Sequence, residues 1–222
     1  MPRFIYLHGF ASSPGSRKAR FFAERFQQLG IGLDIPDLAE GNFRNLTLTA
    51  QLNVIARLSR DQPASLIGSS MGGYLAALYA ARHPGQIEKL VLLAPAFSFG
   101  SRWPETLGGR AMEQWKRTNT LKVFHYSEGR EVELGYQLVE DALQYEAYPD
   151  VQQPVLIFHG RGDTVVPPDY SVRFAEQHSN ARLRLLHSDH ELGNVLDTMW
   201  IETEEFLFGS KLDPLVDGGQ RH

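Results

Sequence analysis

The chain has 222 residues, 42% of them hydrophobic and 22% charged, which is enough to bury one large core, so we expect a single domain over residues 1–222. Its formal net charge is −4 with Lys and Arg scattered along the chain, which argues against a nucleic-acid-binding footprint. It contains no cysteine, which excludes disulfides and thiolate metal sites.

Apolar runs alternate with amphipathic stretches along the chain, as they do in a doubly wound, mainly parallel α/β sheet. About six strands are predicted, at residues 3–8, 31–35, 64–68, 88–94, 154–158 and 181–187. Helices are predicted at residues 19–29, 48–58, 71–83 and 193–208, and the polar segment 209–222 is expected to fray.

The amino-terminal apolar run is short, lacks a leading basic segment and is interrupted by His8, so it reads as the first strand and not as a signal peptide. No stretch approaches the ~20 apolar residues that a membrane span requires. We therefore expect a cytoplasmic protein with no membrane span.

One region breaks the alternation, because nearly sixty residues separate the fourth and fifth predicted strands. We predict that residues 96–153 form an inserted cap, with a hairpin of 121–125 and 131–135 and a helix over 138–148. The segment is rich in aromatic residues, most of which we expect to pack against one another. Phe97, Phe99 and Trp103 are predicted to wall a substrate pocket.

A Gly-x-Ser-x-Gly pattern stands where the strand at 64–68 gives way to the helix that begins at Met71. A serine between a strand and a helix needs a sharp turn, and Gly68 and Gly72 relieve the crowding that the turn creates. The pattern therefore predicts Ser70 as a nucleophile whose Oγ is exposed at the carboxyl end of the strand.

An acid and a base follow where this fold requires them. Asp163 comes just after the strand at 154–158, and His190 comes just after the last strand. Because the carboxyl ends of parallel strands share one edge of the sheet, Ser70, Asp163 and His190 can meet there as nucleophile, acid and base. Asp37 is an alternative acid, although its strand should lie far from His190.

The amino-terminal strand ends in His8-Gly9-Phe10, and the loop after it reaches the same edge. Attack by a serine creates an oxyanion, which needs preorganised donors. The backbone N–H groups of Phe10 and Met71 are the predicted donors. His8 and Gly9 are expected to support this loop, with Gly9 allowing a close approach of the backbone.

These residues resemble the α/β-hydrolase superfamily over nearly the whole chain. The opening Tyr6–Ser16 and the elbow Gly68–Tyr74 resemble compact bacterial esterases of the YqiA/YcfP family, and Asp163 and His190 match that group's acid and base. The resemblance implies hydrolysis of a small carboxylic ester or thioester through an acyl-enzyme, without a cofactor. An amidase, a carbon–carbon hydrolase and a non-catalytic binding protein on the same fold remain alternatives.

A metal site is the weakest interpretation of the candidate residues. His187, Asp189 and His190 are close in sequence, but they lack the spacing of metal ligands on one element. We predict no metal and a small-molecule partner, with no nucleic acid.

Overall fold

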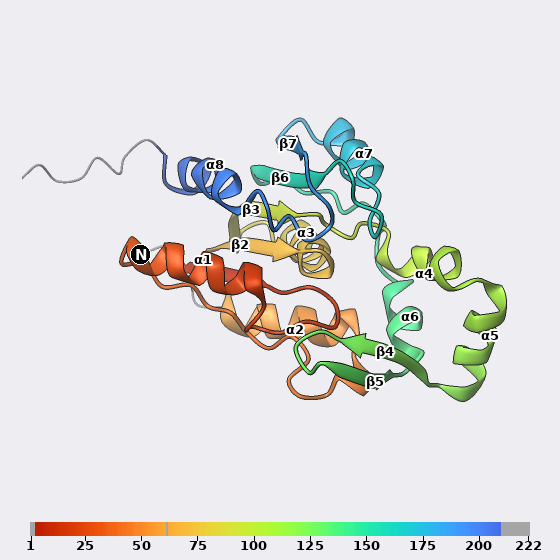
Figure 1. The fold of residues 1–222 in the computed structure, drawn as a ribbon. Helices are drawn as coiled ribbons and strands as arrows, with labels where there is room; N and C mark the ends of the chain where they lie inside the picture. Colours follow the sequence, from red (N-terminus) through yellow and green to blue (C-terminus); the bar gives the residue numbers. More distant parts are fainter. Residues whose placement is uncertain (1–2, 61, 210–222) are drawn as a thin grey trace, which may run out of the picture.

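The structure is a computed structural model, and it describes residues 3–60 and 62–209. The predicted tail at 209–222 therefore lies outside the described residues except for Gly209. Five parallel strands form the main sheet in the order β1-β2-β3-β6-β7 (Figure 1). Their bounds are Arg3–Leu7, Ala64–Ser69, Ile87–Leu93, Val155–Gly160 and Ala181–Leu186.

Helices cover both faces of this sheet. Helices α1 (Arg17–Gln28) and α8 (Leu196–Phe208) pack on one face. Helices α2 (Leu48–Leu58), α3 (Met71–Arg82) and α7 (Asp169–Gln177) pack on the other. The prediction of a mainly parallel α/β sheet is confirmed, with five strands in the main sheet where about six were expected.

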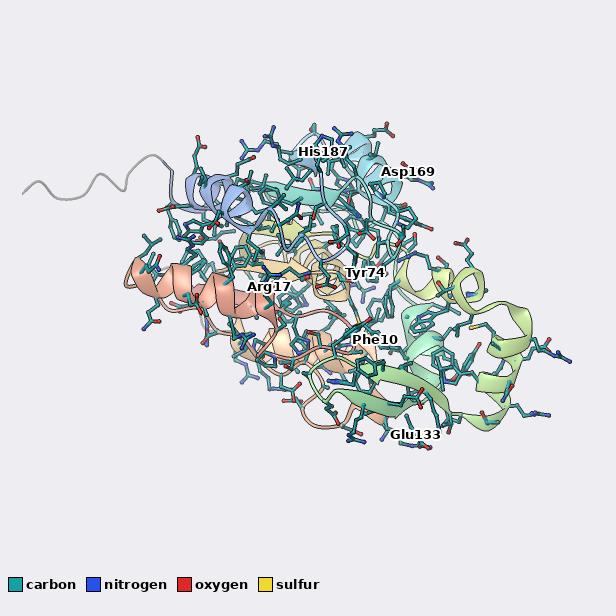
Figure 2. All side chains as sticks on the ribbon, in the orientation of Figure 1. Phe10, Arg17, Tyr74, Glu133, Asp169 and His187 are labelled. Atoms are coloured by element: carbon teal, nitrogen blue, oxygen red, sulfur yellow. The ribbon has the colours of Figure 1, made fainter. Side chains whose placement is uncertain are left out.

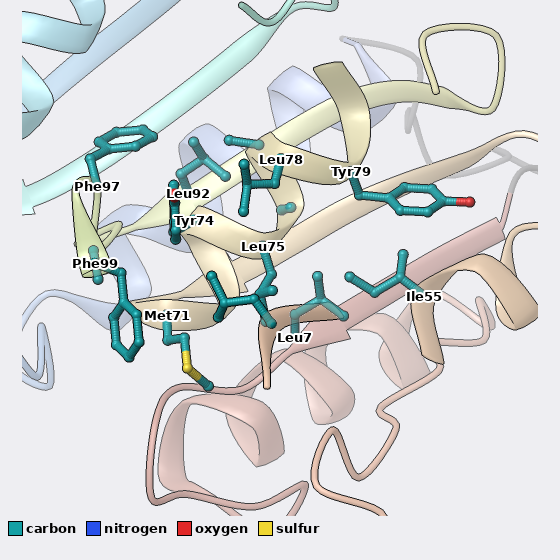
Figure 3. Close-up of a cluster of buried hydrophobic side chains, with 14 of the residues drawn as sticks. Leu7, Ile55, Met71, Tyr74, Leu75, Leu78, Tyr79, Leu92, Phe97 and Phe99 are labelled. Carbon is teal, nitrogen blue, oxygen red and sulfur yellow. The ribbon is translucent and has the colours of Figure 1, made fainter. Parts of the chain in front are cut away.

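Alternate residues of each strand enter two separate hydrophobic clusters, because successive side chains of a strand point to opposite faces. Phe4 and Tyr6 of β1 pack toward α1 and α8, whereas Ile5 and Leu7 pack toward α2 and α3. Figure 3 shows the second cluster, in which α3 presents Met71 and neighbouring residues to the sheet. Each central strand is thus buried on both faces and reads as a continuous apolar run.

The prediction of a strand at residues 31–35 is wrong. The structure has a single bridge there, between Ile5 and Asp34. The N–H of Tyr6 donates to Asp34 O at 2.8 Å, and the N–H of Asp34 donates to Phe4 O at 2.9 Å. Pro36 has no N–H to continue the ladder, and Gly32 has no side chain to pack, so this edge pairing stays one residue long.

The insertion between β3 and β6 contains helices α4 (Phe99–Leu107), α5 (Gly109–Thr118) and α6 (Gln137–Ala142). It also contains the hairpin of β4 (Leu121–His125) and β5 (Arg130–Leu134), which matches the predicted hairpin. These elements form the green region on the right of Figure 1. The predicted helix over 138–148 is wrong in its second half, since α6 ends at Ala142.

The carboxyl ends of the parallel strands lie at one edge of the sheet, and the connections that leave them carry the three predicted catalytic residues and Phe10. The β1–α1 loop carries Phe10, the β2–α3 turn carries Ser70, and the β6–α7 loop carries Asp163. The loop between β7 and α8 carries His190. The topology therefore brings together loops as far apart in the chain as those of Phe10 and His190.

Candidate active site

Ser70 occupies a strained turn between β2 and α3. Its backbone has φ 54° and ψ −116°, a conformation that L residues other than glycine rarely adopt. The neighbouring strand holds it there, because the N–H of Ser70 donates to Leu93 O at 2.8 Å. The carbonyl of Ser70 accepts from Ala96 N at 3.0 Å. The turn is thus fixed from both sides, as expected for a nucleophile elbow.

The glycines around Ser70 are required by backbone contacts. A Cβ on Gly72 would lie 2.2 Å from Leu7 O, and one on Gly68 would lie 2.4 Å from Gly72 O. Neither contact can be relieved by a side-chain rotation, since both involve main-chain atoms. The small residues therefore allow α3 to begin directly against the end of β1.

His190 lies between Ser70 and Asp163. Its Nε2 is 3.1 Å from Ser70 Oγ, and its Nδ1 is 2.7 Å from Asp163 Oδ2. Because a carboxylate only accepts, Nδ1 carries the hydrogen, which leaves Nε2 free to accept from the Ser70 hydroxyl. The structure brings the three predicted residues together in the hydrogen-bonded order serine, histidine and aspartate.

Asp163 is buried and its carboxylate is fully satisfied. Oδ1 accepts from the N–H groups of Val165 and Val166 at 2.9 and 2.8 Å, and Oδ2 lies 3.1 Å from His159 Nε2 as well as accepting from His190. Burial by itself would raise the pKa of Asp163, but hydrogen bonds from His159 and His190 outweigh it and hold that pKa well below its usual range. The group is therefore a carboxylate at neutral pH.

His159 on β6 contacts the carboxylate of Asp163 directly. The ring is fully buried on β6, with Nε2 facing two acceptors, Asp163 Oδ2 and Val166 O. Nε2 must therefore carry a hydrogen. Nδ1 lies 2.7 Å from the hydroxyl of Ser171 on α7. The i, i+4 spacing of His159 and Asp163 across a strand end is the sequence signal for this pair.

The loop after β1 approaches the elbow closely. A Cβ on Gly9 would lie 3.4 Å from both Ser69 O and Ser70 Cβ. The N–H groups of Phe10 and Met71 donate to no acceptor within residues 3–60 and 62–209. Both predicted donors thus stand beside Ser70 with their hydrogens available, which is what an oxyanion hole needs.

His8 supports this loop from below. Its Nε2 accepts from the N–H of Leu38 at 3.1 Å, and its Nδ1 lies 3.0 Å from Gly9 O. Burial lowers the pKa of His8, so the ring is neutral, with Nδ1 as the donor. The side chain ties the end of β1 to the segment that follows the Asp34 bridge.

Aromatic rings form a wall next to the oxyanion loop. Phe10 contacts Phe43, Phe99 and Trp103, with ring centroids 5.5, 6.2 and 5.7 Å apart. Figure 2 shows Phe10 beside the hairpin of β4 and β5. Phe43 lies in the connection between α1 and α2. The sequence does not predict it as a pocket residue, because it lies outside the insertion that suggested a pocket wall.

The three pocket residues predicted in the cap differ in their surroundings. Phe97 is fully buried and stacks on Phe174, with centroids 4.4 Å apart, so it belongs to the core and not to an accessible wall. Phe99 is 8% exposed, and Trp103 is partly exposed. These two contact Phe10 directly and stay candidates for the pocket.

The two other aspartates considered as site residues, Asp37 and Asp189, accept hydrogen bonds within their own turns. Asp37 accepts hydrogen bonds from the N–H groups of Ala39 and Gly41, which caps its own turn. Asp189 Oδ1 accepts from the N–H of Glu191, which closes a local turn. Among the residues that the structure describes, no three His, Asp or Glu side chains gather in a way that could hold a metal ion.

The fold and the hydrogen-bonded serine, histidine and aspartate at its carboxyl edge define an α/β hydrolase. Residues 3–205 match the family described as "Uncharacterised protein family (UPF0227)", and the chain belongs to that family. The expected resemblance to YqiA/YcfP-like proteins of the α/β-hydrolase superfamily is confirmed.

Relatives with named activities are more distant. The human protein named "Palmitoyl-protein thioesterase ABHD10, mitochondrial" is 26% identical over 216 residues, which span 88% of this chain and 69% of the relative. The solved structure of Est1E from Butyrivibrio proteoclasticus with ferulic acid bound is 25% identical. It covers 93% of this chain and 88% of its own, with a TM-score of 0.77.

A putative hydrolase from Agrobacterium vitis S4 has the same fold, with a TM-score of 0.80, 24% identity, and coverage of 91% of this chain and 87% of its own. In the part of this chain that the structure describes, no helix has the length and apolar character needed to cross a membrane.

Proposed function

We propose that this chain is a serine hydrolase that cleaves a carboxylic ester or thioester through an acyl-enzyme. One observation carries the proposal. Ser70 Oγ lies 3.1 Å from His190 Nε2, and His190 Nδ1 lies 2.7 Å from a buried carboxylate that accepts two further backbone hydrogen bonds. The relatives named as a thioesterase and an esterase support the same chemistry.

The proposed reaction begins when Ser70 Oγ attacks the carbonyl carbon and His190 Nε2 takes the hydroxyl proton. Asp163 stabilises the imidazolium that forms, and the N–H groups of Phe10 and Met71 receive the oxyanion. His190 then gives its proton to the departing alcohol or thiol. Water repeats the sequence on the acyl-enzyme and releases the acid, so no metal or cofactor takes part in these steps.

The aromatic wall favours an apolar acyl group. Phe10, Phe43, Phe99 and Trp103 would contact the acyl chain, and each methylene that they bury contributes about 0.8 kcal/mol. We propose that specificity rises over the first few carbon atoms and then levels off or falls, because a wall built from so few residues cannot line a long channel.

The test is a panel of p-nitrophenyl esters from acetate to palmitate, a feruloyl ester, and acyl thioesters of matched length. The proposal predicts turnover with a burst of p-nitrophenol equal to the enzyme concentration, and the highest kcat/KM between acetate and hexanoate. If folded protein turns over none of these compounds, it is a binding protein or acts on another bond, such as an amide. A maximum at palmitate would contradict the short pocket.

A further inference from the structure

A lysine lies buried beneath the loop that carries His190. Lys18, in the first turn of α1, is 9% exposed. Its Nζ donates to the backbone carbonyl of Glu191 at 2.9 Å and lies 3.3 Å from the carboxylate of the same residue. Glu191 directly follows His190, so the ammonium group is bonded to the carbonyl of the residue next to the proposed base.

Burial of a lysine requires compensation, since Lys is almost never buried unless it is paired. Loss of solvent lowers the pKa of Lys18, and the nearby carboxylates of Glu191, Asp189 and Asp163 work in the opposite direction. The charge thus sits within the field of the carboxylates that surround His190. Simple packing of α1 would be served better by an apolar residue at this position.

The position is not explained by the amphipathic pattern of α1. Lys18 lies four residues before Phe22 and eight before Phe26, on the face that is otherwise apolar and buried. A charged residue on the buried stripe of a helix is the signal that sequence reasoning passed over. Its long side chain reaches out of the apolar cluster to the loop.

Hydrogen bonds hold the loop between β7 and α8 at several residues, and the bond from Lys18 lies between the other two along the loop. Gly162 N donates to Ser188 O at 2.9 Å before His190, and Arg17 donates to Gly193 O at 3.2 Å after it. Figure 2 shows Arg17 at the end of α1 that faces this loop. The Arg17 contact is exposed, whereas that of Lys18 is partly buried.

We propose that Lys18 is a positioning residue, which fixes the backbone after His190 and places a positive charge near the imidazole. This inference rests on the proposed function, because it assumes that His190 is the base. The contact also joins α1, which follows the Phe10 loop, to the loop of His190. One side chain therefore connects the segments that carry the oxyanion donor and the base.

The charge of Lys18 and its hydrogen bond to the backbone of Glu191 lead to separate predictions. A positive charge disfavours the imidazolium, whereas the carboxylates of Asp163, Asp189 and Glu191 favour it. Arg17 adds a second, exposed positive charge. Removing the charge of Lys18 should therefore move the acid side of the kcat/KM profile to higher pH, by about half a pH unit. Removing the carboxylate of Glu191 should move it to lower pH.

The experiment compares Lys18→Met with Lys89→Met in the full chain. Lys89 is the matched control, because its Nζ, like that of Lys18, is bonded to the backbone of another segment. It donates to Phe206 O and Leu207 O from the start of β3, at the opposite end of the sheet. Lys18→Met should lower kcat by about tenfold or more, as small misplacements of a catalytic group do, and change KM by less than about twofold. Lys89→Met should leave kcat and the pH profile unchanged.

Two further variants separate the effect of the Lys18 charge from the effect of its hydrogen bond to Glu191 O. Glu191→Gln, at an exposed side chain, keeps the backbone carbonyl and should shift only the acid side of the profile. The double variant Lys18→Met with Glu191→Gln should return the acid side to near its wild-type position while kcat stays low. Because Glu191→Gln removes no buried group, this arm stays informative if Lys18→Met fails to fold.

The inference is overturned if folded Lys18→Met matches Lys89→Met in kcat, or if Lys18→Met and Glu191→Gln shift the profile in the same direction. Failure of the proposed function looks different, because the wild-type protein would then show no serine-dependent turnover on any compound of the panel.

Discussion

Two regions of the molecule meet at Ser70, and they hold their residues by different means. At the carboxyl edge of the sheet, backbone contacts fix the site, with Gly72 against Leu7 O and Ser70 N bonded to Leu93 O. The inserted segment 96–153 has backbone bonds of its own, such as that from Tyr126 N to Ala11 O, but it relies on side chains as well. Thr49 on α2 bonds Asp141 through both its N–H and its hydroxyl, and Arg82 on α3 pairs with Glu146.

This difference separates chemistry from specificity. Backbone contacts leave little room for substitution, so the edge can present one arrangement of nucleophile, acid and base. Side-chain contacts tolerate change at moderate cost, so the aromatic wall can be altered without loss of the fold. We expect changes at the edge to affect the rate of reaction, and changes in the insertion to affect the choice of acyl group.

The largest effect is expected from loss of the nucleophile. Ser70→Ala should reduce kcat/KM by about 10⁴-fold or more, and His190→Ala by a similar factor, since members of a triad act as a unit. The double variant should be no worse than either single one. Steady-state kinetics measure the loss, and circular dichroism should show an unchanged fold. Near-full activity of Ser70→Ala would remove the serine from the mechanism.

A glycine variant tests the rigidity of the edge. Gly72→Ala would place a Cβ 2.2 Å from Leu7 O, and we expect it to lower the free energy of unfolding by about 3 kcal/mol or more and to abolish turnover. Gly32→Ala is the control, because no heavy atom lies within 4 Å of its Cβ position. Urea melts of both variants check this, and equal stability of the two would show that the edge can relax.

Truncation of two cap aromatics should affect different properties, stability for Phe97 and acyl-chain preference for Trp103. Phe97→Ala removes a fully buried ring and should cost about 3–5 kcal/mol of stability without changing the order of preferred acyl chains. Trp103→Ala should cost less stability and move the acyl-length optimum toward longer chains. Melts and kinetics on the ester panel measure both quantities. An unchanged acyl profile in Trp103→Ala would mean that this residue does not face the substrate.

The smallest expected effect concerns stability in acid. The pKa of Asp163 is held below its usual range in the folded protein, whereas in the unfolded chain it titrates near ~3.9. The folded state therefore gains stability from the carboxylate at pH values above ~3.9, and loses this gain as the pH falls toward the folded pKa. Denaturant melts between pH 3 and 7 should show a shallower acid slope for Asp163→Asn. A slope equal to that of the wild type would contradict the depressed pKa.

Much of the edge could be predicted from the sequence because its signals are local. A Gly-x-Ser-x-Gly turn and polar residues at strand ends indicate their own local geometry, so the sequence alone predicts that Ser70, Asp163 and His190 lie at one edge. The contacts between elements could not be found in this way. Those of Lys18 with Glu191, and of Phe43 with Phe10, join segments far apart in the chain.

Helices α4, α5 and α7 are absent from the sequence prediction. Helix α7 turns Ser171 and Phe174 inward, one polar and one apolar, because Ser171 has a partner in His159. The strand expected at 31–35 has apolar residues, but the lack of an N–H at Pro36 limits its pairing to one bridge. Local pattern identifies a segment, whereas its neighbours in the fold decide how far it extends.

The most direct test of the central claim is labelling with a fluorophosphonate, which reacts covalently with an activated serine. We predict that the folded wild-type protein takes up one equivalent and that mass spectrometry of the digest places it on Ser70. Ser70→Ala should take up none, and His190→Ala should react far more slowly. A folded wild-type protein that stays unlabelled, or a label that persists in Ser70→Ala, would contradict the assignment of Ser70 as the nucleophile.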